Sequence, residues 1–338
     1  MITHLQDYIG IVFLKSTLRL KSIVLYIHKM RIPKSSEIEV YSMNEYQLIS
    51  DYKHIDKYKL SFNSLAQSIF GIDFKPWYEQ GGWNDKYICY SFIDEDHVIA
   101  NASINKMTIL INKKEYNAIQ IGTVMTHPDY RMQGLSRKLI DHIIAKYEHE
   151  YDFLYLFANE RALDFYPKFG FERMQESSFS LNVAHLSNQP TTTYSVRPLS
   201  IGNPVDFSMI KNFAVKRTPV SSALSVINNE HQLLFYFILP FHDSFYYIEE
   251  ADVIVIFKHE DHQLHIFDII STTSFDINTV LKSIISPDTE VIHFYFTPDY
   301  PIDQVKAELI SQSEDTLFIR PLLKELPQHF MFPITSHA

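Results

Sequence analysis

The sequence predicts a mixed α+β fold in two successive domains, each with a mixed twisted sheet flanked by helices. Its length of 338 residues fits two domains of ordinary size. Apolar residues make up 46% of the chain and charged residues 21%, which is typical of globular proteins. The expected order of strands and helices in the first half recurs in the second half, in a degenerate form without sequence identity.

The first half is expected to alternate between strands and helices. Its clearest element is a helix at 134–149, where Leu135, Leu139, Ile143 and Tyr147 recur four residues apart. The continuous apolar run at 152–158 predicts a buried strand. The other expected elements are a strand at 46–50, a helix at about 56–70, strands at 87–94, 97–110 and 115–126, a short helix from Asn159 and two small strands near 171–183.

The second half is expected to follow the same order. Residues 186–196 are polar and read as a linker, so we predict domains at 43–185 and 197–338. The expected elements are strands at 233–239, 245–250, 252–258 and 264–270, a helix that begins after Asp276, a strand at 291–297, a helix from Pro301 and a strand at 316–320.

Composition excludes several classes of function. The formal net charge of −10 argues against nucleic-acid binding. The single cysteine, Cys89, excludes an internal disulfide framework and a cysteine-based zinc site. His259, His262 and His265 are spaced three apart, but no carboxylates accompany them in a matched ligand set. We therefore interpret them as surface residues and predict no metal.

The N-terminal stretch is apolar but interrupted by charge. Lys15, Arg19 and Lys21 leave no run of about 20 apolar residues that could span a membrane. The stretch also lacks the cleavage pattern of a secretory signal. Residues 1–42 are then either a basic amphipathic appendage or an extension before a start at Met43. We interpret them as a basic N-terminal extension, and we expect a cytoplasmic protein without membrane partners.

The segment 123–139 carries the strongest chemical signal. It reads as a strand, a polar turn and a helix that starts at Gly134. The first amides of a helix lack internal partners and carry partial positive charge, so this arrangement suits an anion. Arg131, Arg137 and Lys138 add positive charge. The spacing does not fit the P-loop or the dinucleotide fingerprint.

Two motifs in this half resemble those of the GNAT acetyltransferases. VMTHPDYRMQGLSRKLI resembles their motif A, with the pattern (Arg/Gln)-x-x-Gly-x-(Gly/Ala), and NERALDFYPKFGF (159–171) resembles motif B. Ser136 departs from the usual Gly or Ala. The resemblance covers about 46–183 and implies tandem GNAT folds, the second degenerate. The arrangement is similar to the enhanced intracellular survival acetyltransferases without their third domain.

The resemblance also implies a role for each motif residue. Tyr166 would be the general acid that protonates the leaving thiolate of acetyl-CoA, the co-substrate. Asn159 would hydrogen-bond the pantetheine arm. Backbone groups of Val124, Met125 and Thr126 would line that arm. The loop and first helical turn would cradle the pyrophosphate through Arg131, Met132, Gln133, Gly134, Leu135, Ser136 and Arg137.

The sequence does not identify the general base. Glu79, Asp85, Glu115 and His127 are more typical of surface or turn residues. Tandem-domain relatives and the N-myristoyltransferases use the terminal carboxylate, so the apolar tail 328–338 could bring the carboxylate of Ala338 to the site. A tail packed on its own domain is the other interpretation.

The second half lacks the residues needed for a second cofactor site. No glycine follows Gly202, and the turn between 264–270 and the next helix carries no basic residue. We therefore expect one acetyl-CoA site per chain. The acceptor pocket is expected between residues 71–87 and the second domain, where Trp77, Tyr78 and Trp83 with Glu79 and Asp85 could receive a cation.

The predicted function is acetyl-CoA-dependent transfer of an acetyl group to a primary amine of a small molecule. One alternative is a non-catalytic acyl-CoA sensor that uses the same cradle. Another is acyl transfer to a protein or peptide amine, or transfer of a longer acyl chain. The sequence leaves the acceptor and the oligomeric state open.

Overall fold

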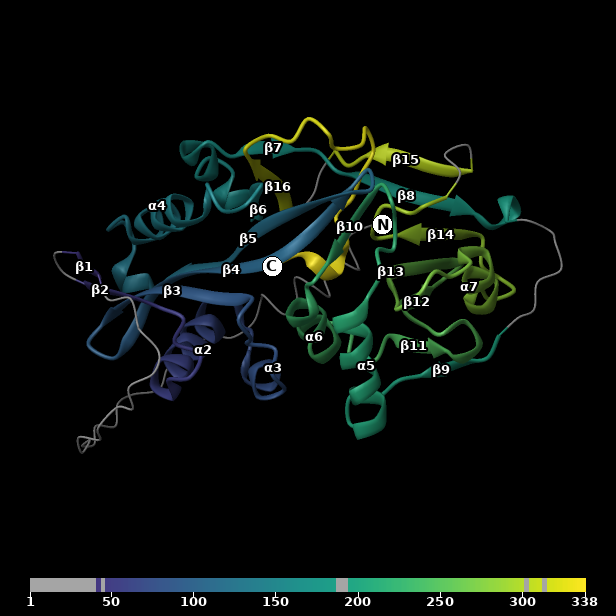
Figure 1. Cartoon of the computed structure of the whole chain (residues 1–338), viewed down its shortest axis with the longest axis horizontal. Coiled ribbons are helices and arrows are strands. Elements are labelled where there is room, and N and C mark those ends of the chain that lie inside the picture. Colours follow the sequence, from purple (N-terminus) through teal and green to yellow (C-terminus); the bar gives the residue numbers. More distant parts are fainter. Residues whose placement is uncertain (1–40, 44–45, 187–193, 301–303, 312–314) are drawn as a thin grey trace. The chain divides into compact units, whose positions relative to one another are not determined.

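The computed structural model describes residues 41–43, 46–186, 194–300, 304–311 and 315–338, whose strands form two mixed sheets (Figure 1). The predicted mixed α+β class is confirmed. The first sheet contains β1 (Tyr41–Met43), β2 (Tyr46–Ser50), β3 (Tyr87–Asp94), β4 (His97–Ile111), β5 (Lys114–Thr126), β6 (Phe153–Asn159), β7 (Glu172–Met174), β10 (Leu224–Ile227) and β16 (Asp315–Arg320). The second contains β8 (Ser177–Asn182), β9 (Val196–Pro198), β11 (Phe245–Ile248), β12 (Val253–Glu260), β13 (Gln263–Ser271), β14 (Val291–Phe294) and β15 (Val305–Leu309). The helices are α2 (Asp56–Phe70), α3 (Lys75–Glu79), α4 (Leu135–Tyr147), α5 (Pro204–Lys216), α6 (Glu230–Ile238) and α7 (Ile277–Ile284).

The described chain divides into two compact units. The first unit contains the described residues before Pro76, together with Ile88–Ala102 and Thr123–Leu139. The second unit contains Pro76–Tyr87, Ser103–Gly122 and Ile140–Ala338. The long strands β4 and β5 therefore contribute one end to each unit.

In the first unit, β2 pairs antiparallel with both β1 and β3. Helix α2 buries Phe62, Leu65 and Ala66. It ends at Gly71, which adopts the left-handed conformation (φ 72°) and donates its amide to the Gln67 carbonyl. Glycine suits this position because it carries no Cβ penalty there. Residues 1–40 of the predicted extension lie outside the described residues, and Tyr41–Met43 form β1.

In the second unit, β5 and β6 pair in parallel only over Ala118–Gln120 and the residues opposite. Strand β16 comes from near the end of the chain, yet it pairs antiparallel with both β6 and β7 (Figure 1). Conversely, β8 belongs to the predicted first domain in the sequence, yet it pairs with β14 and β15 in the second sheet. Each half of the sequence thus completes the sheet of the other.

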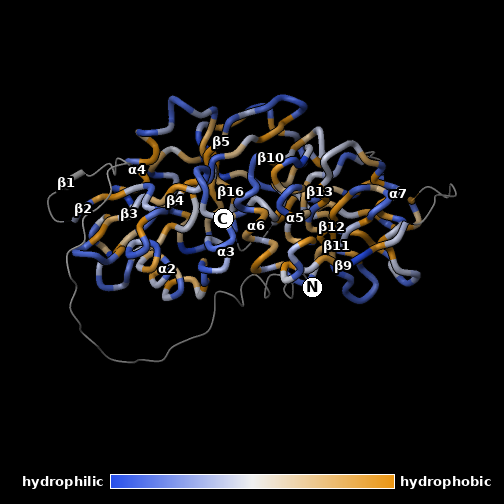
Figure 2. Tube along the Cα trace, turned by 60° about the horizontal axis from the view of Figure 1, so that its bottom comes forward, coloured by the Kyte–Doolittle hydropathy of each residue, from blue (hydrophilic) through white to orange (hydrophobic). Residues whose placement is uncertain are grey.

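The second sheet lies wholly in the second unit, in the order β15-β8-β14-β13-β12-β11-β9. Helix α7 lies beside β12–β14 and packs Val280, Leu281 and Ile284 into the apolar core of this sheet (Figure 1). Apolar residues follow β12 and β13 in Figure 2, as expected for strands buried on both faces.

Several predicted elements are confirmed and two are wrong. The periodic helix is α4, whose apolar stripe from Leu139 to Tyr147 is buried. The predicted strand at 233–239 is instead the end of α6, because a continuous apolar run does not distinguish a strand from a helix buried on most sides. The predicted helix from Pro301 is wrong where the structure describes it: Val305–Leu309 form strand β15. Helix α5 was not expected.

Candidate active site

The strand before the predicted cradle contains a strained residue. Thr123 in β5 has φ 48°, which is uncommon for a β-branched residue. A buried chain of hydrogen bonds holds its carbonyl: the Asn101 amide donates to Thr123 O (2.9 Å), Ser91 Oγ donates to Asn101 Oδ1 (2.8 Å), and Tyr52 Oη lies 2.6 Å from Ser91 Oγ. Strain of this kind persists where the surroundings fix it, often at functional sites.

The loop 126–137 leads from the end of β5 into the first turn of α4. Met132 (φ 63°) and Gly134 (φ 74°) both adopt left-handed backbone conformations. A Cβ at Gly134 would meet no atom within 4 Å, so this backbone is open to approach. Lys138 N–H donates to the Gly134 carbonyl, which places the preceding amides in the first turn of α4. Met132 is fully exposed at the loop tip.

Side chains of the predicted motif hold the loop in place. Thr126 Oγ1 lies 2.8 Å from Ser136 Oγ, which joins the end of β5 to the first turn of α4. Arg131 Nε donates to Thr126 O (3.3 Å), and Tyr46 Oη donates to Gln133 Oε1 (3.2 Å). Ser136, which departs from the Gly or Ala of the expected pattern, therefore has Thr126 as a specific partner. Met125 is buried and Val124 is half-buried.

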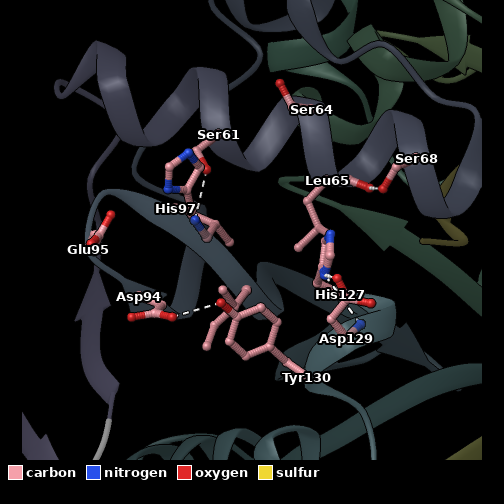
Figure 3. A pocket seen from close by; sticks show the side chains of 12 residues that line it. Ser61, Ser64, Leu65, Ser68, Asp94, Glu95, His97, His127, Asp129 and Tyr130 are labelled. Carbon is pink, nitrogen blue, oxygen red and sulfur yellow. Dashed lines mark hydrogen bonds and ion pairs between the residues drawn. The ribbon is translucent and has the colours of Figure 1, made fainter. Parts of the chain in front are cut away.

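A polar pocket of about 430 Å³ lies within the first unit beside this loop (Figure 3). Tyr130 Oη donates to Asp94 Oδ2 (2.7 Å), and this hydrogen bond raises the pKa of Tyr130 to about 12. His127 Nδ1 accepts from the Asp129 amide, so His127 is a turn residue as expected. The pocket is lined by Ser61, Ser64, Leu65, Ser68, Asp94, Glu95, His97, Val98, Ile99, His127, Asp129 and Tyr130.

The C-terminus lies where β5 and β6 stop pairing. A Cβ on Gly122 would lie only 2.8 Å from the Ala338 Cβ and 3.3 Å from the Ala338 carbonyl carbon, so the last residue sits directly against β5. The His337 ring stacks on Phe157 of β6, with centroids 3.6 Å apart. Burial lowers the pKa of His337 to about 3, so this ring is neutral at physiological pH. Ala338 itself is exposed.

The tail is held by hydrogen bonds along its length. Gln120 Nε2 donates to Ser336 O (2.7 Å), and Tyr236 Oη donates to His337 O (2.9 Å). Glu176 accepts from the Phe332 amide (2.7 Å), and burial raises the pKa of Glu176 to about 8. Sequence reasoning missed Gln120, although a glutamine within an apolar strand was a visible signal.

Tyr166 starts a 3-10 turn, Tyr166–Phe169, and is buried among aromatic rings of Phe165, Phe171 and Phe318. Burial raises its pKa to about 12. Among the described residues, no hydrogen bond or ring contact joins Tyr166 to His337 or Ala338. Arg320 from β16 donates to Phe169 O and to Glu148 Oε2, and its Nη1 would lie 2.8 Å from a Cβ on Gly170.

Asn159 lies at the end of β6. Its side-chain oxygen accepts from the Arg161 amide (3.2 Å) and caps the turn Glu160–Ala162. This bond uses the oxygen, and an asparagine amide also carries two N–H donors. The expected short helix from Asn159 is this 3-10 turn.

The aromatic segment is packed rather than open. Trp77 and Trp83 are 2% and 7% exposed and form a cluster with Tyr87. Trp77 Nε1 donates to His231 O (2.7 Å), and Lys86 Nζ donates to Glu230 Oε2 (2.6 Å). Residues 76–87 therefore do contact α6, as expected, but the two tryptophans are not available as an open cage for a cation.

The turn before α7 differs from the loop 126–137. The N-terminus of α7 is capped by Asp276, whose carboxylate accepts from the Asn278 and Thr279 amides. These hydrogen bonds, with that from the Thr279 hydroxyl foremost, lower the pKa of Asp276, so an anionic side chain already fills this helix end.

The histidine cluster differs from expectation in one member. His259 and His262 are exposed, as expected, whereas His265 is buried at 7% exposure and stacks on His293. Burial lowers the pKa of His265 to about 4. In the described ranges, no three His, Cys, Asp or Glu side chains come together as metal ligands.

None of the helices within the described ranges combines the length and apolar character required to cross a bilayer. The N-terminal stretch that invited a membrane interpretation lies outside these ranges.

Comparison with known proteins agrees with the mixed α+β fold. Residues 59–174 match the family model described as acetyltransferase (GNAT) domain. A probable N-acyltransferase of unknown function from Enterococcus faecalis V583 is similar at 15% identity and a TM-score of 0.54, over 77% of this chain and 69% of that one. A GCN5-related N-acetyltransferase from Kribbella flavida is similar at 16% identity and a TM-score of 0.52, over 81% of this chain and 71% of that one. Eis1 from Mycobacterium abscessus is similar at 12% identity and a TM-score of 0.50, over 79% of this chain and 72% of that one. No protein of curated function matches the chain.

Proposed function

Because residues 59–174 match the acetyltransferase (GNAT) domain model, we propose that the chain is an acyltransferase that transfers an acetyl group from acetyl-CoA to a primary amine of a small molecule. The amine nitrogen attacks the thioester carbonyl directly. The new C–N bond forms as the C–S bond breaks, the nitrogen loses one proton to a base, and the sulfur gains one from an acid. Residues 43–185 carry the chemistry in this proposal, completed by β16 and the C-terminal tail, while the remainder of 197–338 is the degenerate partner.

The cradle 131–137 is the site proposed for the pyrophosphate of acetyl-CoA. Its fit is supported by the two left-handed residues Met132 and Gly134, the open space at Gly134 and the first-turn amides of α4. Arg131 and Arg137 add positive charge. Bound acetyl-CoA supplies the activated thioester. The backbone of Val124–Thr126 and the Asn159 amide are proposed to hold its pantetheine arm.

The terminal carboxylate of Ala338 is proposed as the general base. Its support is the position of Ala338 against Gly122, the residue that immediately precedes the strained Thr123. A carboxylate accepts a proton from a nitrogen and attracts a cationic amine before reaction. The neighbouring His337 ring is neutral because burial lowers its pKa to about 3, so it does not offset this negative charge.

Tyr166 is proposed as the general acid. Burial raises its pKa to about 12, so the hydroxyl stays protonated through the physiological range. A thiol has a pKa of about 8.5, so the tyrosine is the weaker acid of the two. Its hydroxyl therefore stabilises the leaving sulfur by donating a hydrogen bond as negative charge develops on it.

The proposal is tested by thiol release with acetyl-CoA and a panel of small primary amines, with product identified by mass. We expect amine-dependent release and an acetylated amine. Acetyl-CoA binding without turnover on any amine would favour the sensor alternative. Acetylation of peptide N-termini with no small-amine product would favour the protein-directed alternative. We place this reaction in the cytoplasm.

A further inference from the structure

An ion pair without solvent access lies in the second unit. Arg217 and Asp268 have side chains 1% and 0% exposed. Arg217 Nη1 donates to Asp268 Oδ2 (3.1 Å) and Nη2 to Oδ1 (3.0 Å), a bidentate arrangement. Asp268 Oδ1 also accepts from the Ile269 amide, and Oδ2 accepts from the Thr335 hydroxyl. Both carboxylate oxygens therefore have two donors each, and one donor belongs to the C-terminal tail.

A β-bulge sets the direction of Asp268. Ile256 of β12 lies opposite Asp268, but the next residue, Phe257, lies opposite Ile266, so Phe267 is an extra residue in β13. Before the bulge, Leu264 and Ile266 point into the core with α7, and after it Ile269 does. The bulge therefore shifts Asp268 off this core face, where strict alternation would have placed its charge.

Thr335 connects this ion pair to the end of the chain. It lies in the 3-10 turn Ile334–Ser336, is 0% exposed, and precedes Ala338 by three residues. The turn is closed by Ser336 N–H on Pro333 O and His337 N–H on Ile334 O. A rigid turn of this kind transmits the position of Thr335 to the residues that follow it.

Burying two charges rarely gains net stability over apolar residues of the same shape, because their desolvation offsets their attraction. A role in placing the chain end explains the arrangement better. We propose that Arg217, Asp268 and Thr335, here called the tail clamp, are positioning residues that hold the carboxylate of Ala338 beside Gly122 for proton transfer. This inference rests on the proposed function, in which that carboxylate is the base.

Thr335→Val tests the clamp because it keeps the shape of the side chain and removes the hydroxyl. We expect kcat to fall about tenfold to a hundredfold, since a displacement of about 1 Å of a reacting group can cost about 10²-fold. The KM for acetyl-CoA should not change. Thr335→Ser should restore kcat, because it returns the hydroxyl. If Thr335→Val does not fold, Thr335→Ala replaces it, because the smaller side chain cannot overpack the site. We expect the same loss of kcat in Thr335→Ala.

Thr297→Val is the matched control. Thr297 is also buried (4% exposed), and its hydroxyl bonds Met331 of the same tail, further from the chain end. It should lose comparable stability in urea unfolding while retaining kcat. Release of Ala338 by carboxypeptidase, followed by mass, should accelerate in Thr335→Val and not in Thr335→Ser. A folded Thr335→Val protein with wild-type kcat, or an equal loss of kcat in Thr297→Val, would overturn the proposal.

A chain made by semisynthesis with a C-terminal carboxamide separates the clamp from the base. Full activity of the carboxamide protein would show that the carboxylate is not the base. It would therefore also refute the role of the tail clamp. An inactive carboxamide protein together with an active, folded Thr335→Val protein would refute the clamp alone.

Discussion

Gly122→Ala is predicted to displace the end of the chain. The added Cβ would lie 2.8 Å from the Ala338 Cβ and 3.3 Å from its carbonyl carbon. Carbon atoms in contact prefer a separation of about 3.5–4.0 Å. The terminal residue must therefore move by about 1 Å. Gly122 itself does not have a positive φ, so alanine introduces no backbone strain there.

The size of the effect follows from this displacement. Overpacking of a buried site costs about 1–3 kcal/mol, which a folded domain tolerates. Misplacement of a catalytic group by about 1 Å costs about 10²-fold in rate. We therefore expect Gly122→Ala to fold and to lose about tenfold to a hundredfold in kcat.

The assay is steady-state thiol release with a saturating amine, with unfolding followed in parallel. Ala338→Gly keeps the carboxylate and removes the methyl group at 2.8 Å, so it should be nearly as active as the wild type. In the double variant Gly122→Ala/Ala338→Gly, the remaining close contact joins the new Cβ to the carbonyl carbon of residue 338 at 3.3 Å. Relieving it needs a shift of a few tenths of an ångström, so most of the lost activity should return. A folded Gly122→Ala protein with full kcat would refute the catalytic placement of the terminus.

Three further predictions follow from the described residues. Tyr166→Phe should lower kcat about tenfold or more with unchanged acetyl-CoA affinity by calorimetry; an unchanged turnover number would remove its role as acid. Asn101→Ala should remove one hydrogen bond from the carbonyl of Thr123 and weaken acetyl-CoA binding, measured in the same titration, and unaltered binding would show that this hydrogen bond is dispensable. The buried Glu176 has its pKa raised to about 8, so the unfolded chain ionises first and wild-type stability should fall as pH rises from about 4.5 to 8. Glu176→Gln should flatten that slope in urea unfolding at a series of pH values, and an identical slope in both proteins would contradict this assignment.

Much of the fold was predictable because local signals agree with the tertiary structure. The four-residue spacing from Leu135 to Tyr147 marks α4, and Asp276 marks the start of α7. The run at 233–239 carries no such signal, since its helix is buried on most sides. The pairing of β16 with β6 joins residues about 160 positions apart, and nothing local in either strand specifies its partner.

The candidate site was predictable where it rests on a contiguous motif. The loop 131–137 and Asn159 fall in such motifs. The tail was expected either at the site or packed on its own domain; Ala338 lies against Gly122, and its catalytic role stays a prediction. The supporting polar groups were not predicted. Ser91 and Asn101 are wholly buried and bond each other, and only their polarity within apolar strands hinted at this.

Acetyl transfer to a small amine is tested most directly by mass-spectrometric measurement of both products in one reaction. The purified chain is incubated with acetyl-CoA and a panel of small primary amines, and free CoA and acetylated amine are quantified together. We expect one acetylated amine for each CoA released, at a rate that depends on the amine. Binding of acetyl-CoA with neither product formed, or CoA release unaffected by any amine, would contradict this expectation.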